Sequence, residues 1–148
     1  MSGRTRGYAH RVDIAAGAEL VWKALTQTEN LRKWCSPEAQ INAREGGHFR
    51  ASVDRVTEME AHIDVLLPQR RMRLIYQPTE ALLQNDSPIV DDFILDGSEP
   101  GKTVLRLLGS GFPADHESDT FYMRLRTGWE RAVARLKVLS EQLAKESA

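Results

Sequence analysis

The stretch that decides the fold is Ile41–Arg50, with the sequence INAREGGHFR. Its adjacent glycines, Gly46 and Gly47, are typical either of a loop that binds phosphate or of a tight turn between strands. A Walker-type phosphate loop needs a following Lys-Ser or Lys-Thr and a helix, and a dinucleotide loop needs three spaced glycines that open a helix. Here an alternating apolar and polar segment follows instead. The glycines therefore predict a hairpin or bulge with positive φ, not a nucleotide site.

Alternation with a period of two continues on both sides of this turn, which predicts strands with one apolar and one polar face. In Glu58–Leu67, for example, Met59, Ala61 and Ile63 alternate with acidic residues and a histidine. An antiparallel sheet of such strands is dry on one side only. The predicted strands are Tyr8–Ala15, Gln40–Arg44, His48–Arg55, Glu58–Leu67, Arg71–Gln77, Ile89–Leu95 and Thr103–Leu108.

Three segments have helical spacing instead. Two short helices are predicted near the N-terminus, at Ala18–Thr26 and from Thr28 to Trp34, with Thr28 as the N-cap of the second. A long helix is predicted from about Glu117 to Leu143. Its apolar stripe is Tyr122, Leu125, Trp129, Ala132, Leu136, Leu139 and Leu143. The long helix is the natural cover for the dry face of the sheet, so the sequence predicts an α+β fold with a cavity between the two.

Composition supports one soluble domain covering residues 1–148. The chain has 28% charged residues and a net charge of −1, so it is no general polyanion binder. A single cysteine excludes an internal disulfide and favours a reducing compartment. No apolar run reaches the roughly 20 residues of a membrane span, and the basic N-terminus has no apolar segment of a signal peptide behind it. A cytoplasmic protein with no membrane span is expected.

Charge is nonetheless uneven along the chain. The segment from Glu80 to Asp119 has nine acidic residues but only two basic ones, Lys102 and Arg106. This pattern is typical of solvated loops, and alternatively of a surface that prefers cationic partners. Within the same region, Pro78–Pro88 has no regular pattern and is predicted to be a mobile loop.

Several motifs together resemble the family of homologues of the activator of heat-shock-protein ATPase, within the START-like and Bet v-like (SRPBCC) superfamily. The motifs are VDIAAGAELVWKALT at Val12–Thr26, TENLRKW at Thr28–Trp34, REGGHFR at Arg44–Arg50, GSGF at Gly109–Phe112, and GWE at Gly128–Glu130 before a leucine-bearing helix. The resemblance implies a helix-grip fold: a seven-stranded antiparallel sheet wrapped around the C-terminal helix. It also implies a hydrophobic cavity that holds small apolar molecules in relatives. It transfers no catalytic residues.

Residues on the inner faces of this fold are the candidate ligand-binding residues. Among them, Asp91 shares a strand face with Phe93 and Leu95, so it is expected to point inward, where a carboxylate needs a partner. The Tyr76 hydroxyl is a better partner than Arg73, which lies on the opposite face by parity. A polar anchor in an apolar pocket is typical of small-molecule sites, and placement at a solvated strand edge is the alternative. The full candidate set is Trp34, Met72, Tyr76, Asp91, Phe93, Tyr122, Leu125 and Trp129.

Other reactive side chains are interpreted as structural. Cys35 is expected to be a partly buried or incidental thiol, because His48 and His62 are both predicted to point outward. The four histidines lack metal-ligand spacing, so no metal and no cofactor are expected. The arginines of the long helix are interpreted as a solvated face, and no nucleic-acid binding is expected. They are Arg124, Arg126, Arg131 and Arg135.

Three functions remain open. The first is a binding protein for a small hydrophobic ligand, without catalytic residues of its own. The second is an interaction module, a chaperone cofactor or stress-response partner, for which the acidic Glu80–Asp119 region is the candidate surface. The third is a cyclase- or hydrolase-type enzyme that uses Asp91 with Tyr76 as a pocket acid. A homodimer is compatible with each.

Overall fold

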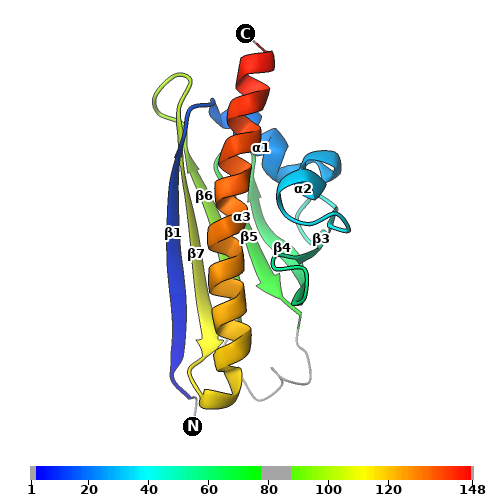
Figure 1. Cartoon of the computed structure of the whole chain (residues 1–148), viewed down its shortest axis with the longest axis vertical. Helices are drawn as coiled ribbons and strands as arrows, with labels where there is room; N and C mark the ends of the chain where they lie inside the picture. The colour runs from blue at the N-terminus through cyan, green and yellow to red at the C-terminus, as the bar shows by residue number, and fades with distance from the viewer. Residues whose placement is uncertain (1–2, 78–87, 148) are drawn as a thin grey trace.

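The computed structural model describes residues 3–77 and 88–147. A seven-stranded antiparallel sheet, in the order β1-β7-β6-β5-β4-β3-β2, curves around one long helix. Figure 1 shows this helix, α3, running along the concave face, with α1 and α2 beside it. The elements are β1 Thr5–Ile14, α1 Ala18–Thr26, α2 Thr28–Trp34, β2 Gln40–Ile41, β3 His48–Ser52, β4 Glu58–Leu67, β5 Arg71–Tyr76, β6 Val90–Asp96, β7 Thr103–Pro113, the short helix η2 His116–Ser118 and α3 Asp119–Glu146. The predicted α+β helix-grip architecture is confirmed.

The glycine pair is a turn, as predicted. It separates β2 from β3, which pair antiparallel, and Gly46 has a φ of +79°. A Cβ on Gly47 would lie 1.8 Å from the carbonyl oxygen of Asn42, so only glycine allows the chain to fold back this closely. The amide of Gly46 donates to the carbonyl of Ile63 in β4, which ties the turn to the next strand.

Some predicted boundaries were wrong. The strand expected over Gln40–Arg44 ends at Ile41, because Asn42 and Arg44 already belong to the glycine turn. The strand expected over Thr103–Leu108 continues to Pro113, since β1 pairs with it as far as Thr5. Thr28 is the first residue of α2 and not its N-cap; Gln27 occupies the N-cap without a side-chain hydrogen bond. The loop predicted at Pro78–Pro88 lies outside the described residues except for Pro88.

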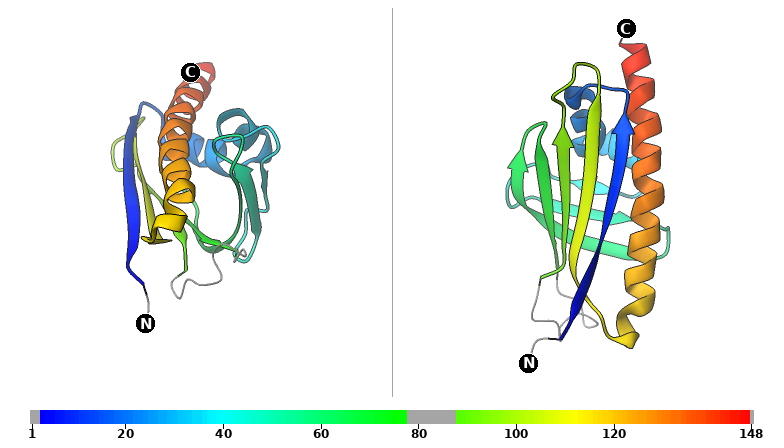
Figure 2. Two further views of the ribbon diagram at one scale, coloured as in Figure 1. Left: turned by 60° about the horizontal axis from the view of Figure 1, so that its bottom comes forward. Right: turned by 90° about the vertical axis from the view of Figure 1, so that its left-hand side faces the viewer.

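The core lies between α3 and the inner face of the sheet. Figure 2 shows the sheet wrapping around the helix along most of its length. The predicted stripe of α3 is buried as far as Leu136, whereas Leu139 and Leu143 are only half-buried near the end of the helix. From the sheet, alternate residues of β5 and β6 point inward, among them Met72, Phe93 and Asp91. The helix and sheet thus bury the residues from which a ligand site was expected.

Candidate functional site

A carboxylate lies in the centre of the apolar core. Asp91 is fully buried on the inner face of β6, where strand alternation predicts it. Its Oδ1 accepts a hydrogen bond of 2.5 Å from the Tyr8 hydroxyl, and its Oδ2 accepts one from the Tyr76 hydroxyl. The Trp129 indole N–H lies 3.4 Å from the Tyr76 oxygen and donates to it. The expected pairing of Asp91 with Tyr76 is confirmed, and the solvated strand edge is excluded.

Gly109 allows Tyr8 to reach this carboxylate. In the sheet, Gly109 of β7 lies between Tyr8 of β1 and Asp91 of β6. A Cβ at Gly109 would lie 2.4 Å from the Tyr8 ring, so the ring occupies the space above a residue without a side chain. Tyr8 was not predicted as a member of this cluster, although its parity with Ile14 places it on the inner face.

Burial dominates the ionisation of the cluster. It raises the pKa of Asp91 from 3.8 to about 6, while the hydrogen bonds from Tyr76, Tyr8 and Trp129 act in the opposite direction. Burial, with the Asp91 charge adding to it, raises the pKa of both tyrosines well above the usual value. The tyrosines therefore remain hydrogen-bond donors at neutral pH. A carboxyl group with this pKa could act in acid–base chemistry only if a substrate could reach it, and its side chain is fully covered.

The eight predicted binding residues come together in this core. Each is at most 8% exposed. The Trp129 ring packs edge-on against Phe93 at 5.4 Å and lies 6.4 Å from the Trp34 ring, between ring centroids. Only Trp34 among the eight also lines the groove described next. Whether the other seven contact a ligand stays a prediction.

An open groove of about 840 Å³ lies beside the core, between α3, the end of α2 and the β3–β4 turn. Trp34 and Val53, both buried, lie at its floor together with Gly128 of α3. A Cβ at Gly128 would lie 2.7 Å from a methyl group of Val53, so the glycine lets α3 approach the sheet closely at this point. The Trp34 indole is fixed by its hydrogen bond to the Ala24 carbonyl at 2.7 Å.

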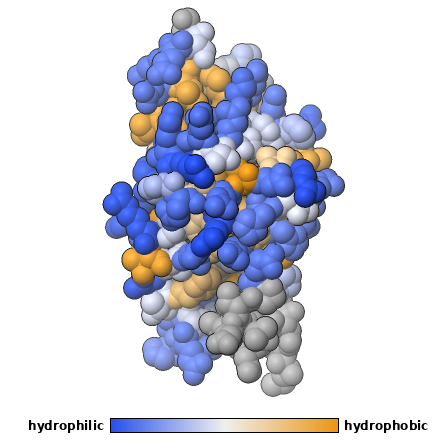
Figure 3. Space-filling view, turned by 90° about the vertical axis from the view of Figure 1, so that its right-hand side faces the viewer, coloured by the Kyte–Doolittle hydropathy of each residue, from blue (hydrophilic) through white to orange (hydrophobic). Residues whose placement is uncertain are grey.

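Basic side chains form the rim of the groove. Arg124, Arg131 and Arg135 of α3 are exposed, as predicted for a solvated face, and they also line the groove. Arg126 is exposed and is not part of the lining. Opposite α3, Arg55 lines the groove from the β3–β4 turn. Figure 3 shows the side of the molecule with α2 and this turn; hydrophilic residues cover most of it, with separate apolar residues between them.

The remaining candidate residues have structural surroundings. Cys35 is buried at the groove wall, and burial raises the pKa of its thiol to about 12, so it is protonated and a poor nucleophile. His48 and His62 are cross-strand neighbours on the outer face of the sheet. Among residues 3–77 and 88–147, no three His, Cys, Asp or Glu side chains are placed to hold a metal ion. None of the described helices is long and apolar enough to cross a membrane.

The acidic region does not form one surface in its described part. Asp91 is in the core, and Asp92, on the outer face of β6, forms two hydrogen bonds with Arg71 of 3.0 and 2.7 Å. Asp119 pairs with Arg6 at 2.7 Å. The acidic residues Glu80 and Asp86 lie outside the described residues.

Residues 15–141 match the family described as Activator of Hsp90 ATPase homolog 1-like protein. The chain belongs to this family. The resemblance found in the sequence motifs is therefore confirmed. A search of curated proteins found no significant match.

Solved structures similar to this member of the family show the same fold. Protein MLL2253 from Mesorhizobium loti superimposes with a TM-score of 0.74 at 22% identity, covering 93% of this chain and 98% of that one. The Aha1 dimer from Colwellia psychrerythraea gives 0.73 at 22% identity, covering 92% and 96%. An Hsp90 activator from Plasmodium falciparum gives 0.72 at 13% identity, covering 90% and 94%.

Proposed function

We propose that this protein is a small-molecule-binding helix-grip domain without catalytic residues of its own, and that its ligand binds in the groove between α3, α2 and the β3–β4 turn. The observation that carries the proposal is the groove itself. Its volume of about 840 Å³ lies within the roughly 300–1,000 Å³ of small-molecule sites. Its lining has exposed apolar side chains, Pro37 and Met123, over the buried Trp34 and Val53, and its rim is polar, which is the usual distribution in such sites.

The binding proposal is favoured over an enzyme by the position of the carboxylate. Asp91 and Tyr76, the pair considered as a pocket acid, are not part of the groove lining. Their polar atoms are already satisfied by each other, by Tyr8 and by Trp129. The cluster is therefore interpreted as a polar clamp that joins β1, β5, β6 and α3 behind the groove. Trp129, which donates to the Tyr76 hydroxyl of this cluster, lies 6.4 Å from the Trp34 ring between ring centroids.

The proposal is tested by native mass spectrometry of protein purified without added ligand. A mass excess that disappears on denaturation is expected, and its mass identifies the ligand class. Thr127 is half-buried in the groove lining, so Thr127→Trp should fill the groove and abolish the excess. Glu130→Trp, exposed on the same helix and outside the lining, is the matched control and should retain it.

Two results would contradict the proposal. An unchanged mass excess in Thr127→Trp would show that the ligand binds outside the groove. The second result is a mass without excess, together with no rise in Tm for any compound of a library of apolar acids, alcohols and amides. This result would contradict ligand binding altogether. The same spectra give the oligomeric state and so test whether the protein forms a homodimer.

A second candidate is an interaction role as a chaperone cofactor. It is favoured by membership of a family described by Hsp90 ATPase activation, and by the fold shared with the Plasmodium falciparum activator. The test is the ATPase rate of the Hsp90 chaperone from the same organism with and without this protein. An unchanged rate at saturating concentration, with no co-migration of the two proteins, would rule this role out.

A further inference from the structure

We propose that the groove is selective for anionic amphiphiles: free small molecules with an apolar body and a carboxylate or phosphate group. This inference rests on the proposed function, because it names the ligand class of the same groove.

Among the residues that the structure describes, the groove has an excess of positive charge that is not neutralised. Its lining, as far as residues 3–77 and 88–147 form it, has six basic and two acidic side chains. Asp119 is paired with Arg6, which is not part of the lining, at 2.7 Å. Asp54 lies 3.9 Å from Arg124 and accepts hydrogen bonds from two backbone amides of its own turn. Within the described part of the chain, five basic side chains of the lining have no carboxylate partner: Arg32, Lys33, Arg55, Arg131 and Arg135.

This excess is a property of the groove and not of the whole surface. On the outer face of the sheet, the two arginines of β5 are paired with carboxylates. Arg73 contacts Asp64 at 2.6 Å, and Arg71 contacts Asp92 at 2.7 Å. Like charges that line one hollow repel each other, and a bound anion relieves this repulsion while gaining charge-assisted hydrogen bonds. The groove therefore favours negative ligands over neutral ligands of the same shape.

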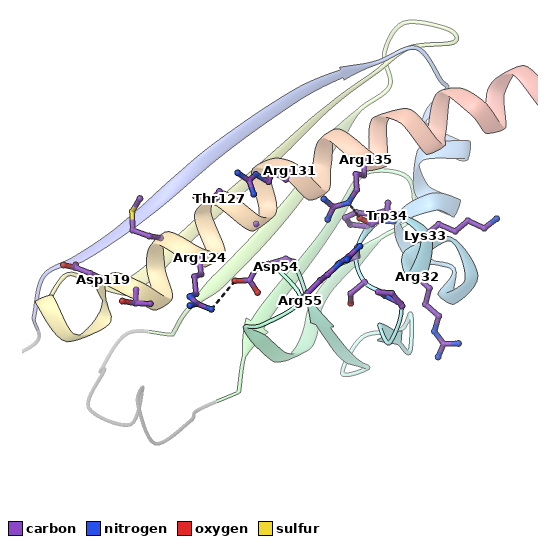
Figure 4. A pocket seen from close by; sticks show the side chains of 17 residues that line it. Arg32, Lys33, Trp34, Asp54, Arg55, Asp119, Arg124, Thr127, Arg131 and Arg135 are labelled. Atoms are coloured by element: carbon purple, nitrogen blue, oxygen red, sulfur yellow. Dashed lines mark hydrogen bonds and ion pairs between the residues drawn. The ribbon is translucent and has the colours of Figure 1, made fainter.

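The arginines come from opposite walls. Arg131 and Arg135 are four residues apart on α3, so they lie on the same side of the helix. Arg135 donates from Nε to the Trp34 carbonyl at 2.7 Å, which directs its guanidinium to the groove. In Figure 4 the Arg55 side chain extends from the β3–β4 turn toward the same Trp34 end. Guanidinium groups converging from two walls suit the several oxygens of a carboxylate or phosphate.

The backbone of Arg55 supports a functional role for its position. Arg55 has a φ of +68°, in the left-handed region that arginine rarely adopts. Strained residues of this kind concentrate at binding sites, where the surrounding structure holds them. Here the Arg55 amide donates to the Ser52 carbonyl at 3.3 Å, and Asp54 accepts from the next two amides. The turn thus presents a basic side chain to the groove at a cost in local conformational energy.

The lining also accounts for an apolar body. Pro37 and Met123 supply the exposed apolar surface of the lining, beside the buried Trp34 and Val53, and the Met123 side chain is adaptable. A ligand that consisted only of an anion would leave this surface in contact with water. An amphiphile uses both parts of the groove.

The test is isothermal titration calorimetry with four probes: octanoate, octyl phosphate, octanol and inorganic phosphate. Octanoate and octyl phosphate should bind at least tenfold more tightly than octanol or phosphate alone. Arg55→Ala/Arg131→Ala should bring octanoate to the affinity of octanol and leave octanol unchanged. Arg126→Ala, exposed on α3 outside the groove, should behave as wild type. Since all three arginines are exposed, the variants should keep the wild-type Tm.

The outcomes separate this inference from the proposed function. Equal affinity for octanol and octanoate would overturn the charge selectivity and leave the groove as an apolar site. Equal affinity for octanoate and inorganic phosphate would overturn the requirement for an apolar body. Sedimentation with phosphatidylserine vesicles without binding of free octanoate would assign the basic face to a membrane surface, and would also overturn it. If no probe bound and the purified protein retained no ligand, the proposed function would be contradicted as well.

Discussion

Replacing Asp91 by asparagine should change how the stability of the protein depends on pH. The pKa of Asp91 is raised from 3.8 in the unfolded chain to about 6 in the core. Between these values the folded state binds the proton more tightly, so the contribution of Asp91 to stability is fully present below pH 4. It is lost as the pH rises through 6. Since one pKa unit corresponds to about 1.4 kcal/mol, the loss between pH 4 and 7 is about 2 to 3 kcal/mol.

The wild-type profile alone would not reveal this loss, because other carboxylates act with the opposite sign. Hydrogen bonds from Arg73 and Arg6 hold the pKa of Asp64 and Asp119 below the usual value, so their contributions grow as the pH rises. The informative quantity is the free energy of unfolding of wild type minus that of Asp91→Asn. The side-chain amide preserves the size of the carboxyl group and removes its titration.

The assay is urea unfolding followed by tryptophan fluorescence between pH 4 and 7.5. The difference between wild type and Asp91→Asn should fall by about 2 to 3 kcal/mol over this range, with most of the fall between pH 4 and pH 6. Asp92→Asn changes a carboxylate on the outer face of the same strand and is the matched control; it should not reproduce the fall. A difference that stays constant with pH would refute the reasoning, because it would show that burial does not shift the ionisation of Asp91.

Two further predictions concern α3. Gly128→Ala should gain about 1 kcal/mol of helix propensity but lose about 1–3 kcal/mol through overpacking against Val53. Gly128→Ala should therefore not stabilise the wild-type protein, but it should stabilise a protein that already has Val53→Ala. The measurement is the free energy of unfolding in urea. A higher free energy of unfolding in both backgrounds would contradict the close contact between Gly128 and Val53. Trp129→Ala should cost about 3–5 kcal/mol, since the ring is fully buried against Phe93 and Trp34. Half-buried Trp22→Ala is the control, and an equal loss in both variants by the same assay would contradict the central position of Trp129.

Local patterns were sufficient to predict the elements of the fold and half of the buried cluster. A period of two places Asp91 with Phe93 on one face of its strand, and Tyr76 with Met72 on one face of the strand before it. These strands are neighbours both in sequence and in the sheet, so parity alone brings Asp91 and Tyr76 together. The prediction depends on no long-range pairing, and for this reason it was correct.

Tyr8 could not be assigned to Asp91 in the same way. Parity places it on the inner face, but β1 joins the sheet beside β7, so the first strand in the chain lies next to the last. The contact also crosses the intervening strand, which is permitted only because Gly109 has no side chain there. Neither the sheet order nor a contact across a strand leaves a periodic signal in the sequence. Gly109, which leaves room for the contact between Tyr8 and Asp91, is the first residue of the GSGF motif. In the sequence this motif indicated only the family resemblance.

The groove was missed for a related physical reason: its charges come from three separate segments. Arg32 and Lys33 are near the end of α2, Arg55 is in a turn, and Arg131 and Arg135 are in α3. In each segment alone, basic residues beside acidic ones are typical of a solvated surface, as was predicted for the helix. Only the approach of α3 to the sheet at Gly128 brings these segments to a common hollow, and a one-dimensional charge pattern contains no information about that approach.

The position of the groove follows from the way the helix and sheet fill the space between them. Trp129, Phe93 and the Asp91 cluster occupy the volume where the sequence predicted a cavity, and the clamp from Tyr8 and Tyr76 holds them there. A ligand in that volume would have to displace aromatic side chains and leave a buried carboxylate without its partners, at a cost of several kcal/mol. Binding at the flank of α3, over the Trp34 ring, avoids both costs. It also places the ligand where five basic side chains lie close together without a carboxylate partner among the described residues. We therefore expect ligand affinity in this protein to be governed by the arginines of the groove, and the aromatic core behind it to govern stability.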